Sequence, residues 1–417
     1  MATAASVGSA LDELATAAGG AAVEAGEGDA VAGVRPRYVA TPGSTDEAAA
    51  VLRVAAARGL QVVVRGRGTA LHWGVPPRGV DLVVGTERLD QVVEHVAGDL
   101  VCVVDAGTTI DALNAEAGRH GQQLALDQPV PGSSVAGAMA TTRSGPRRLL
   151  YGTPRDLVLG ITMVRPDGVV AKAGGKVVKN VAGYDIAKLL GGAYGTLGLV
   201  TRLVVRLHPL PPESRWMRST LPLPEAASAA LALTGSQLAP SAVEVRREAG
   251  ADEADVLVLL EGTQRGVAAR SDAAAGLLGQ EAQVADVATA DLARIDAEPA
   301  DVVVKVAVPL TGVTAVLAAA RDVEQGQQVR CRVQGSGGSG VLMAVLSGES
   351  VADVAAAVER LRAAATGGSA VVLQAPDDVR AHVDSWGPVG GLDLMRRVKD
   401  EFDPDHRFAP GRFVGGI

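Results

Sequence analysis

Residues 65–71 read RGRGTAL and follow directly on the run LQVVV of residues 60–64. The β-branched run is typical of a buried strand. Two glycines at a strand exit let backbone N–H groups approach a phosphate that any Cβ would keep away. The stretch does not match the dinucleotide fingerprint, because Leu71 stands where a further glycine is required and residues 73–77 (WGVPP) cannot begin a helix. Taken alone, it is consistent with a phosphate-binding loop and equally with a tight glycine turn.

Two further glycine-rich stretches lie downstream. Residues 131–137 read PGSSVAG, with the small and hydroxyl residues ATT at 140–142 behind them. Such residues allow a planar ring or a phosphate to lie against the backbone, and a buried tight turn is the alternative. Residues 174–185 read GGKVVKNVAGYD and lead to GTLGLVT at 195–201. Lys176 lies in no GxxxxGK[ST] frame, so this stretch is not the phosphate loop of an NTPase.

Strands and helices alternate around the first glycine stretch. Ser44 and Glu47 form a capping box for a helix that runs to Arg58, and a second helix is predicted over residues 109–120. Further strands are predicted at residues 80–84, 101–105 and 157–164, and loops are expected to dominate the rest of residues 127–198. This interleaving predicts an α+β arrangement.

The pattern changes after Pro209, Pro211 and Pro212. Short strands then alternate with alanine-rich helices, which predicts a second domain with a sheet covered by helices on one face. The predicted strands occupy residues 242–245, 256–261, 302–308, 329–333 and 341–346, and the predicted helices residues 267–278, 313–321 and 351–365. A tail from residue 387 contains one more helical stretch.

Composition limits the class of protein. Hydrophobic residues make up 47% and charged residues 21% of the 417 residues, as in a globular protein of two or three lobes. The net charge of −8 and the 2% of aromatic residues argue against nucleic acid as a partner. Cys102 and Cys331 are too few for an iron–sulfur cluster or a disulfide framework, and no metal site is predicted. No apolar run reaches the roughly 18 residues of a transmembrane helix.

Seven motifs occur in series, and together they carry a family resemblance. They are RGRGT, PGSSVAG, GPRR, YGTPRDLVLG, GGKVVKNVAGYD, KLLGGAYGTLGLVT and FDPDHRFAPGRF. In this order and spacing the chain resembles the flavoprotein family of vanillyl-alcohol oxidase and p-cresol methylhydroxylase. Within that family the motifs most resemble the E subunit of bacterial glycolate oxidase. The resemblance is dense over residues 37–212, lighter over residues 387–413, and weak in between.

The resemblance implies an α+β fold. Its parts would be a two-subdomain FAD-binding domain of the vanillyl-alcohol oxidase type and a ferredoxin-like cap domain over the flavin ring. We expect a flexible leader at residues 1–33, the FAD-binding domain at residues 34–212 and the cap domain at residues 213–386. A C-terminal segment, residues 387–417, would return to the FAD-binding domain.

The resemblance also implies FAD contacts, residue by residue. The first glycine loop would wrap the pyrophosphate, the second stretch would line the diphosphate and the ring, and the tail would bring an arginine near the ring. The residues so assigned are Arg65, Gly66, Arg67, Gly68, Thr69, Ala70, Pro131, Gly132, Ser133, Ser134, Val135, Ala140, Thr141, Ser144, Gly195, Thr196, Gly198, Val200 and Arg412.

Two residues depart from the family pattern. Thr69 stands where members with a covalent flavin carry histidine, so the FAD is expected to be non-covalent. His72 comes three positions later and is interpreted as a loop histidine. Ala409 replaces the asparagine that usually precedes the Pro-Gly of the tail, which weakens the case for ring contacts there.

The catalytic residues cannot be assigned from the sequence. Oxidation of a 2-hydroxy acid needs a base for the hydroxyl proton and a cation for the carboxylate. Related hydroxyacid dehydrogenases use a His-x-Gly-Asp-Gly-Asn-x-His run in the cap, and this chain has no such run. That absence agrees with the resemblance to the E subunit, because the D subunit carries those histidines.

The leading hypothesis is therefore an FAD-binding oxidoreductase subunit of a glycolate or 2-hydroxyacid dehydrogenase (glycolate oxidase) complex. It would pass electrons from a small hydroxy acid, with a D-subunit-like flavoprotein and an iron–sulfur subunit as partners. The complex would lie in the cytoplasm or at the inner face of the membrane, and the chain itself would have no transmembrane segment. A free-standing FAD-dependent oxidoreductase for another alcohol or hydroxy acid is the alternative, and a structural subunit with little redox activity is a third hypothesis.

Overall fold

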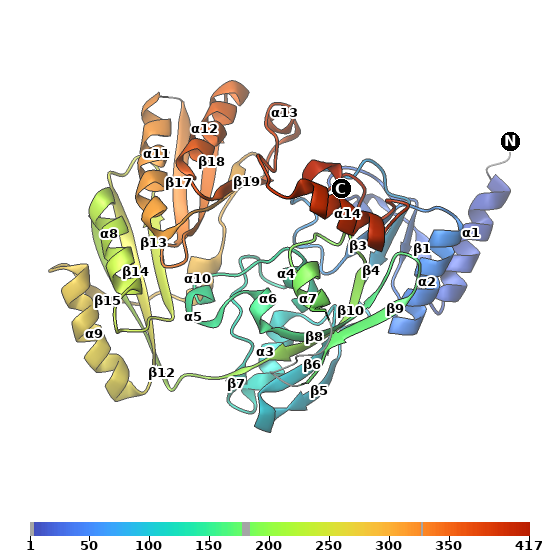
Figure 1. The fold of residues 1–417 in the computed structure, drawn as a ribbon, viewed down its shortest axis with the longest axis horizontal. Helices are drawn as coiled ribbons and strands as arrows, with labels where there is room; N and C mark the ends of the chain where they lie inside the picture. Colours follow the sequence, from blue (N-terminus) through green and yellow to red (C-terminus); the bar gives the residue numbers. More distant parts are fainter. Residues whose placement is uncertain (1–3, 177–183, 327) are drawn as a thin grey trace.

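The computed structural model describes residues 4–176, 184–326 and 328–417; residues 177–183 of the motif GGKVVKNVAGYD lie outside this part. Figure 1 shows an arrangement of two halves, with residues of the first half of the chain on one side, a large sheet with its helices on the other, and the C-terminal helix between them. None of the described helices is long and apolar enough to cross a membrane.

The first subdomain has a four-stranded sheet in the order β1-β2-β4-β3. Strands β2, β4 and β3 run parallel, and β1 pairs antiparallel with β2. The bounds are β1 Ala22–Glu24, β2 Tyr38–Ala40, β3 Val62–Arg65 and β4 Leu82–Gly85, with helices α1 Ala4–Ala17 and α2 Thr45–Ala57. The Ser44 hydroxyl accepts a hydrogen bond from the Glu47 N–H, so the predicted N-terminus of α2 is confirmed.

The structure differs from the expectation of a flexible leader over residues 1–33. Residues Ala4–Ala17 form a helix that packs on α2, and Leu14 and Ala18 are fully buried in the core they share. The sequence here is dominated by alanine and shows little apolar periodicity. Small side chains let two helices approach closely, so a helix with few large apolar residues still buries a face.

The second subdomain has a five-stranded antiparallel sheet in the order β5-β6-β10-β8-β9. Its strands are β5 Val92–Val96, β6 Val101–Asp105, β8 Val158–Val164, β9 Val170–Gly174 and β10 Leu199–Arg206, and β7 Gln122–Gln123 pairs with β11 His208–Pro209. The region expected to be mostly loop also contains four short helices. The helices of this subdomain are α3 Ile110–Gly118, α4 Val135–Ala140, α5 Arg148–Tyr151, α6 Pro154–Leu157 and α7 Ile186–Leu190.

The cap is one antiparallel sheet of eight strands in the order β15-β12-β14-β13-β17-β18-β16-β19. Its strands are β12 Glu213–Pro222, β13 Ala242–Arg247, β14 Glu253–Gly262, β15 Gln283–Ala285, β16 Val302–Ala307, β17 Val329–Ser336, β18 Val341–Gly348 and β19 Ser369–Gln374. Its helices are α8 Leu223–Thr234, α9 Gln264–Leu278, α10 Thr289–Ala293, α11 Val313–Gly326, α12 Val351–Ala364 and α13 Asp377–Arg380.

The strand order shows that the cap consists of two ferredoxin-like units. Each half of the sheet follows the chain order βαββαβ, with its strands in the spatial order 4-1-3-2. The two units join where β13 pairs antiparallel with β17, each the second strand of its unit. The predicted ferredoxin-like cap is therefore a pair of such units in one continuous sheet.

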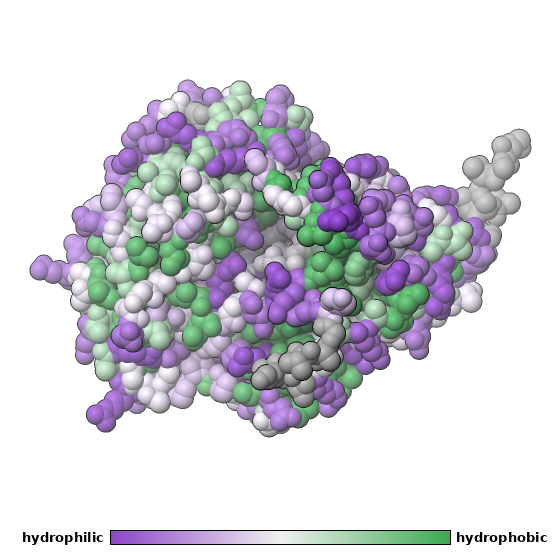
Figure 2. Space-filling view, in the orientation of Figure 1, coloured by the Kyte–Doolittle hydropathy of each residue, from purple (hydrophilic) through white to green (hydrophobic). Residues whose placement is uncertain are grey.

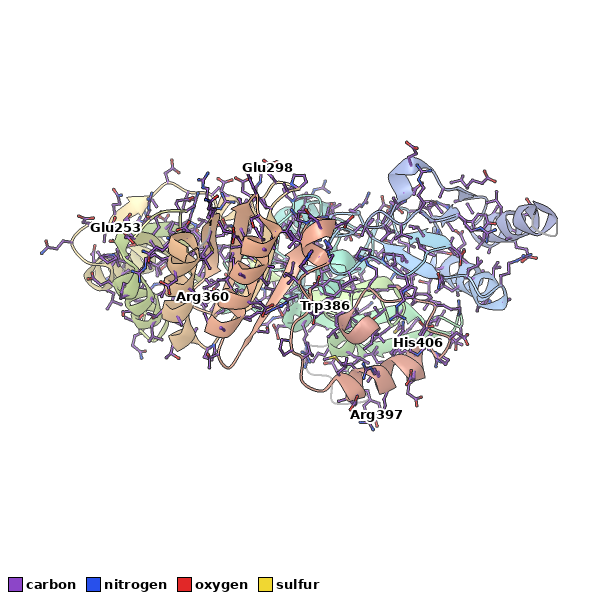
Figure 3. The ribbon with its side chains drawn as sticks, turned by 90° about the horizontal axis from the view of Figure 1, so that it is seen from above. Glu253, Glu298, Arg360, Trp386, Arg397 and His406 are labelled. Carbon is purple, nitrogen blue, oxygen red and sulfur yellow. The ribbon has the colours of Figure 1, made fainter. Side chains whose placement is uncertain are left out.

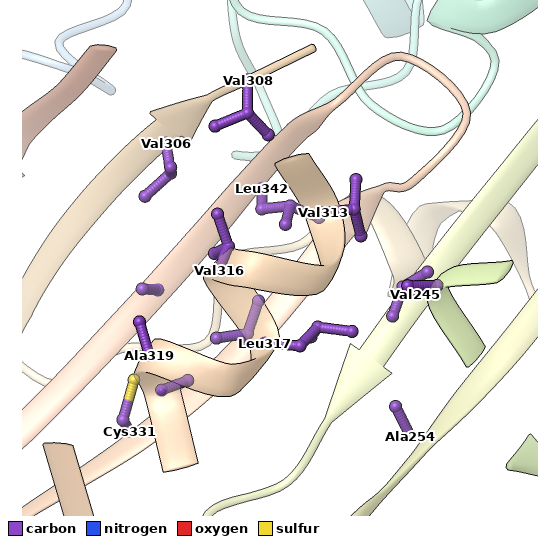
Figure 4. Close-up of a cluster of buried hydrophobic side chains, with 14 of the residues drawn as sticks. Val245, Ala254, Val306, Val308, Val313, Val316, Leu317, Ala319, Cys331 and Leu342 are labelled. Atoms are coloured by element: carbon purple, nitrogen blue, oxygen red, sulfur yellow. The ribbon is translucent and has the colours of Figure 1, made fainter. Parts of the chain in front are cut away.

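One face of the cap sheet is covered by α8, α9, α11 and α12. Figure 4 shows Val316 and Leu317 of α11 among side chains of the strands beneath, including Leu342 and Cys331. These side chains are fully buried. Because successive residues of a strand point to opposite faces, the alternate residues of the same strands point away from these helices.

The C-terminal segment returns to the first subdomain. Helix α14 (Leu392–Phe402) is followed by a stretch in which Val62 donates to the Arg407 carbonyl and Ala409 donates to the Val62 carbonyl. The tail thus extends the first sheet beside β3, and Phe408 is fully buried in the core of that subdomain. Arg412 follows Phe408 by four residues and donates to the Leu71 carbonyl in the loop after β3.

Candidate functional site

A pocket lies at the exit of β3, between the loop of residues 66–71, helix α4 and the loop of residues 193–198. Its empty volume, with the open solvent at its mouth included, is about 890 Å³. The surface in Figure 2 is hollowed between the cap and the C-terminal segment, where these elements meet. The lining residues are Val64, Gly66, Arg67, Gly68, Thr69, Ala70, Leu71, Thr86, Ser134, Ala136, Gly137, Met139, Ala140, Thr141, Arg143, Leu190, Ala193, Tyr194, Gly195, Gly198, Val200 and Arg412.

The loop after β3 presents its backbone to the pocket. None of the consecutive backbone N–H groups from Gly66 to Ala70 donates a hydrogen bond to another atom of the described residues. Gly68 has a φ of +75°, which favours glycine, and a Cβ on Gly66 would lie 2.5 Å from the Ser134 Oγ. A row of free N–H groups in a loop without room for side chains is suited to phosphate oxygens.

Two buried arginines give the pocket a positive charge. Arg143 and Arg412 are 4% and 5% exposed, and neither forms an ion pair with a described carboxylate. One Nη of Arg412 donates to the carbonyls of Leu71 and Trp73 at 2.7 Å, while its Nε is buried without a partner. Burial lowers the pKa of both guanidinium groups to about 10. Buried cations without a counter-ion are costly, so an anionic ligand would stabilise this site.

Arg143 is also fixed by its neighbours. One Nη donates to the Thr69 hydroxyl at 2.8 Å, and the guanidinium carbon lies 5.3 Å from the centre of the Trp73 ring. The Thr69 hydroxyl also lies 3.2 Å from that of Ser133. These contacts join the first glycine loop to the second glycine-rich stretch, as the interpretation of both as one site requires.

Aromatic rings close one end of the pocket. Tyr194 has a φ of +53°, and burial raises the pKa of its phenol to about 12. Its ring packs against those of Trp386 and Phe413, at 5.3 and 5.6 Å between ring centres. Figure 3 shows Trp386 at the junction of the cap half and the other half of the molecule. Through Tyr194, the pocket is therefore in contact with Trp386, in the segment that follows the cap.

Twelve of the predicted site residues line this pocket. They are Gly66, Arg67, Gly68, Thr69, Ala70, Ser134, Ala140, Thr141, Gly195, Gly198, Val200 and Arg412. The other seven, Arg65, Pro131, Gly132, Ser133, Val135, Ser144 and Thr196, do not. The side chain of Arg65 forms ion pairs with Asp29 and Glu87, and Thr196 is buried against the tail.

Sequence reasoning did not single out Arg143, which lies within the predicted stretch 140–144, or Tyr194. Arg143 follows directly on the predicted residues 140–142, and Tyr194 directly precedes Gly195, so each is adjacent in sequence to a predicted residue. A lone arginine or tyrosine beside a glycine motif carries no local signal that distinguishes it from a surface residue.

The cap presents an apolar face with few charges to this region. Trp73 packs against Val303, Val345 and Leu373 of the cap sheet. Arg380, after the last cap strand, donates to the His72 carbonyl at 3.1 Å and also to the Gly74 carbonyl. These hydrogen bonds and apolar contacts hold the cap against residues 72–74, which follow the loop that lines the pocket.

Lys305 is the lysine on this face of the cap sheet. It pairs with Met343 in the β16–β18 register, and burial lowers the pKa of its ammonium to about 8. None of the six histidines lies in a strand of the cap sheet. The described residues contain no group of three or more His, Cys, Asp and Glu that could hold a metal ion.

Comparison with known proteins agrees with this geometry. Residues 36–174 match the family described as "FAD binding domain". The chain is 32% identical to a D-lactate dehydrogenase of Archaeoglobus fulgidus over 206 residues, which are 49% of this chain and 46% of that protein. It is 34% identical to glycolate oxidase subunit GlcE of Escherichia coli over 169 residues, which are 40% of this chain and 48% of that protein. The chain thus matches about half the length of these relatives.

Solved structures share the fold over nearly the whole chain. A similar one is BBE-like 1 of Physcomitrella patens, with a TM-score of 0.66 and 15% identity, covering 99% of this chain and 100% of that one. At this identity the likeness concerns the fold alone. The prediction of a mixed α+β fold with an FAD-binding domain and a large antiparallel cap sheet is confirmed.

Proposed function

We propose that the chain, whose residues 36–174 match the FAD binding domain family, is the FAD-binding subunit of a 2-hydroxyacid dehydrogenase complex of the glycolate oxidase kind. The proposal rests on the contrast between the pocket and the face of the cap sheet opposite it. The pocket offers free N–H groups and buried cations for a large anionic cofactor. The cap sheet opposite offers no histidine for the substrate.

The pocket residues fit FAD. The loop of residues 66–70 would hold the pyrophosphate by its N–H groups, with Ser134 behind it, and the buried Arg143 and Arg412 would balance the negative charge. The small residues Ala140, Gly195 and Gly198 would leave room for the planar ring. Bound FAD would supply a two-electron acceptor for the substrate's hydride, and the chain would position it and exclude water.

The flavin would be held without a covalent bond. Thr69 takes the position from which histidine attaches the flavin in related proteins, and its hydroxyl is already bonded to Arg143. His72 does not line the pocket itself but lines an adjoining groove, which shares Arg67, Gly68, Thr69 and Leu71 with the pocket. Burial and the neighbouring arginines lower the pKa of His72, so it stays neutral at pH 7.

A partner would supply the missing base. Arginine or lysine can bind a carboxylate, but proton abstraction near neutral pH is best served by histidine. The proposed partners are a flavoprotein like the D subunit, with the histidines, and an iron–sulfur protein that carries electrons onward. The resemblance of this chain to GlcE supports such a complex.

The purified chain, loaded with FAD, is expected to reduce an artificial dye with glycolate or D-lactate at a rate about 10²-fold or more below that of the assembled complex. The physical reason is the absence of histidine from the strands of the cap sheet. The assay compares dye reduction by the chain alone with dye reduction after co-expression with the two partner proteins, and a complex assembled without this chain is the control. Rapid bleaching of the isolated chain's flavin by either acid would contradict the subunit assignment.

Lys305 is the observation that favours the alternative of a free-standing oxidoreductase. Its pKa of about 8 leaves part of its ammonium deprotonated near neutral pH, and a neutral amine can take a proton from a hydroxyl group. Replacement of Lys305 by methionine distinguishes the two functions. If bleaching by either acid occurs in the wild type and is lost in Lys305→Met, the chain is catalytic by itself.

A further inference from the structure

A second cavity lies between the loop of residues 144–148 and the cap sheet. It shares no lining residue with the pocket described above, and its empty volume is about 360 Å³. Apolar side chains form much of its wall. The wall also contains the polar side chains of Ser144, Arg148, Glu244 and Ser336. The remaining lining residues are Pro129, Gly145, Pro146, Leu292, Ala293, Ile295, Gln334, Gly335, Val341 and Met343.

Buried polar groups in this wall are incompletely satisfied. Glu244 is 3% exposed, and its Oε1 is buried without a close hydrogen bond within the described residues. Ser336 faces Glu244 directly in the β13–β17 pairing, and its hydroxyl lies near enough to the carboxyl to act on its pKa as a hydrogen-bond donor. The Ser144 hydroxyl is buried and is not hydrogen-bonded to a described residue. Buried polar groups in folded proteins are nearly always hydrogen-bonded, so the Ser144 hydroxyl and the Glu244 Oε1 at one cavity indicate a ligand or ordered water.

The charge of the cavity wall is positive at neutral pH. Burial, with Asp127 nearby, raises the pKa of the Glu244 carboxyl well above its usual range and so favours its neutral form, against the opposing effect of Arg148. Arg148 forms no ion pair within the described ranges, although the adjacent Arg147 pairs with Asp127 at 2.7 Å. Arg148 keeps its charge, since a guanidinium is protonated far above pH 7 even when burial lowers its pKa.

A second cation lies on the same face of the sheet. Met343 lines the cavity and pairs with Lys305 on one side and with Gln334 on the other. Directly paired residues point to the same face, so the Lys305 side chain extends from the face that forms the cavity wall. The wall thus combines a cation, a nearby second cation, a neutral acid and two hydroxyls.

We propose that this cavity binds one small carboxylate anion of two or three carbons. Arg148 would bind the carboxylate, and the neutral carboxyl of Glu244 and the serine hydroxyls would donate hydrogen bonds to it. The apolar residues Ile295 and Met343 would contact the carbon part of the ligand, which a phosphate or a halide lacks. This site stands apart from the proposed flavin chemistry, because no lining residue is shared.

Calorimetric titration of the FAD-loaded chain with acetate, glycolate and D-lactate at pH 7 tests the proposal. Saturable binding of one carboxylate per chain is expected, with no binding of glycolamide, which has the same shape and no charge. Arg148→Met is expected to weaken binding at least about tenfold, which corresponds to about 1.4 kcal/mol. Arg155→Met, an exposed arginine of the same segment, is the matched control and is expected to leave binding unchanged.

Glu244→Gln examines the role of the neutral acid. Glutamine keeps a neutral donor at the same place, so binding is expected to stay within about threefold of the wild type, a difference of less than 1 kcal/mol. Thermal unfolding of each variant checks that it is folded. Absence of saturable carboxylate binding in the wild type would show a cavity holding water only and would overturn the proposal, as would equal binding by Arg148→Met. Binding without any flavin reduction would leave this site standing and count only against catalysis by the chain.

Discussion

Replacement of Lys399 by methionine is expected to lower the free energy of unfolding by about 3–5 kcal/mol. Lys399 is fully buried in α14, and its Nζ lies 2.7 Å from a carboxylate oxygen of Asp403, which is 1% exposed. The same Nζ donates to the carbonyls of Thr196 and Phe408. Methionine fills the space but leaves a buried carboxylate and two carbonyls without their donor. Urea unfolding followed by circular dichroism measures the loss.

The matched control is Arg396→Met on the same helix. Arg396 is half-exposed and pairs with Asp393, which is almost fully exposed, so its loss is expected to change the unfolding free energy by less than about 0.5 kcal/mol. A loss below about 1 kcal/mol in Lys399→Met would contradict the buried network. The network joins the tail to Thr196, next to Gly195 of the pocket, so the same variant is expected to bind FAD more weakly.

Gly66→Val is expected to weaken FAD binding about 10- to 100-fold. The added side chain enters the pocket, and its Cβ would lie 2.5 Å from the Ser134 Oγ, which caps α4 by accepting from the Gly137 N–H. Overpacking of this kind costs about 1–3 kcal/mol, and about 1.4 kcal/mol is a factor of ten in affinity. Gly66 is absent from the glycines with positive φ, so valine meets no backbone strain there. Fluorescence titration of the apoprotein with FAD measures the affinity.

Gly98→Val is the control for Gly66→Val. Gly98 is exposed in the short 3-10 helix Ala97–Asp99, a Cβ there would meet no atom within 4 Å, and its φ is not positive. FAD affinity is expected to be unchanged in this variant, and far-UV circular dichroism is expected to be unchanged in both. Full FAD affinity in Gly66→Val would contradict the assignment of the loop to the pyrophosphate.

Much of the fold could be predicted because local signals were strong. The capping residues Ser44 and Thr109 mark the beginnings of α2 and α3, and the predicted strand at residues 101–105 is β6. Helix α1 was missed because its buried face is made largely of alanine. The second ferredoxin-like unit was missed because two such units can be recognised only from the spatial order of the strands. The sequence pattern does not show that β13 pairs with β17.

The site residues likewise fall into two groups, those that the sequence could identify and those that only the folded structure shows. Glycine and hydroxyl residues at a strand exit have a local conformational reason to be there, so the loop of residues 66–70 and Ser134 could be selected from the sequence. Arg143 and Tyr194 enter the pocket only through the packing of distant segments. The raised pKa of Glu244 likewise depends on burial between the cap and the loop of residues 144–148, which no sequence pattern reveals.

The central claim is that this chain holds FAD in the pocket at the exit of β3 and holds it without a covalent bond. Acid precipitation of the purified protein, followed by measurement of flavin in the supernatant against total protein, tests both parts at once. The account predicts a yellow supernatant with about one FAD for each chain, as one such pocket requires. A protein that yields no flavin would contradict the claim of FAD binding, and colour that stays with the pellet would contradict the claim of non-covalent attachment.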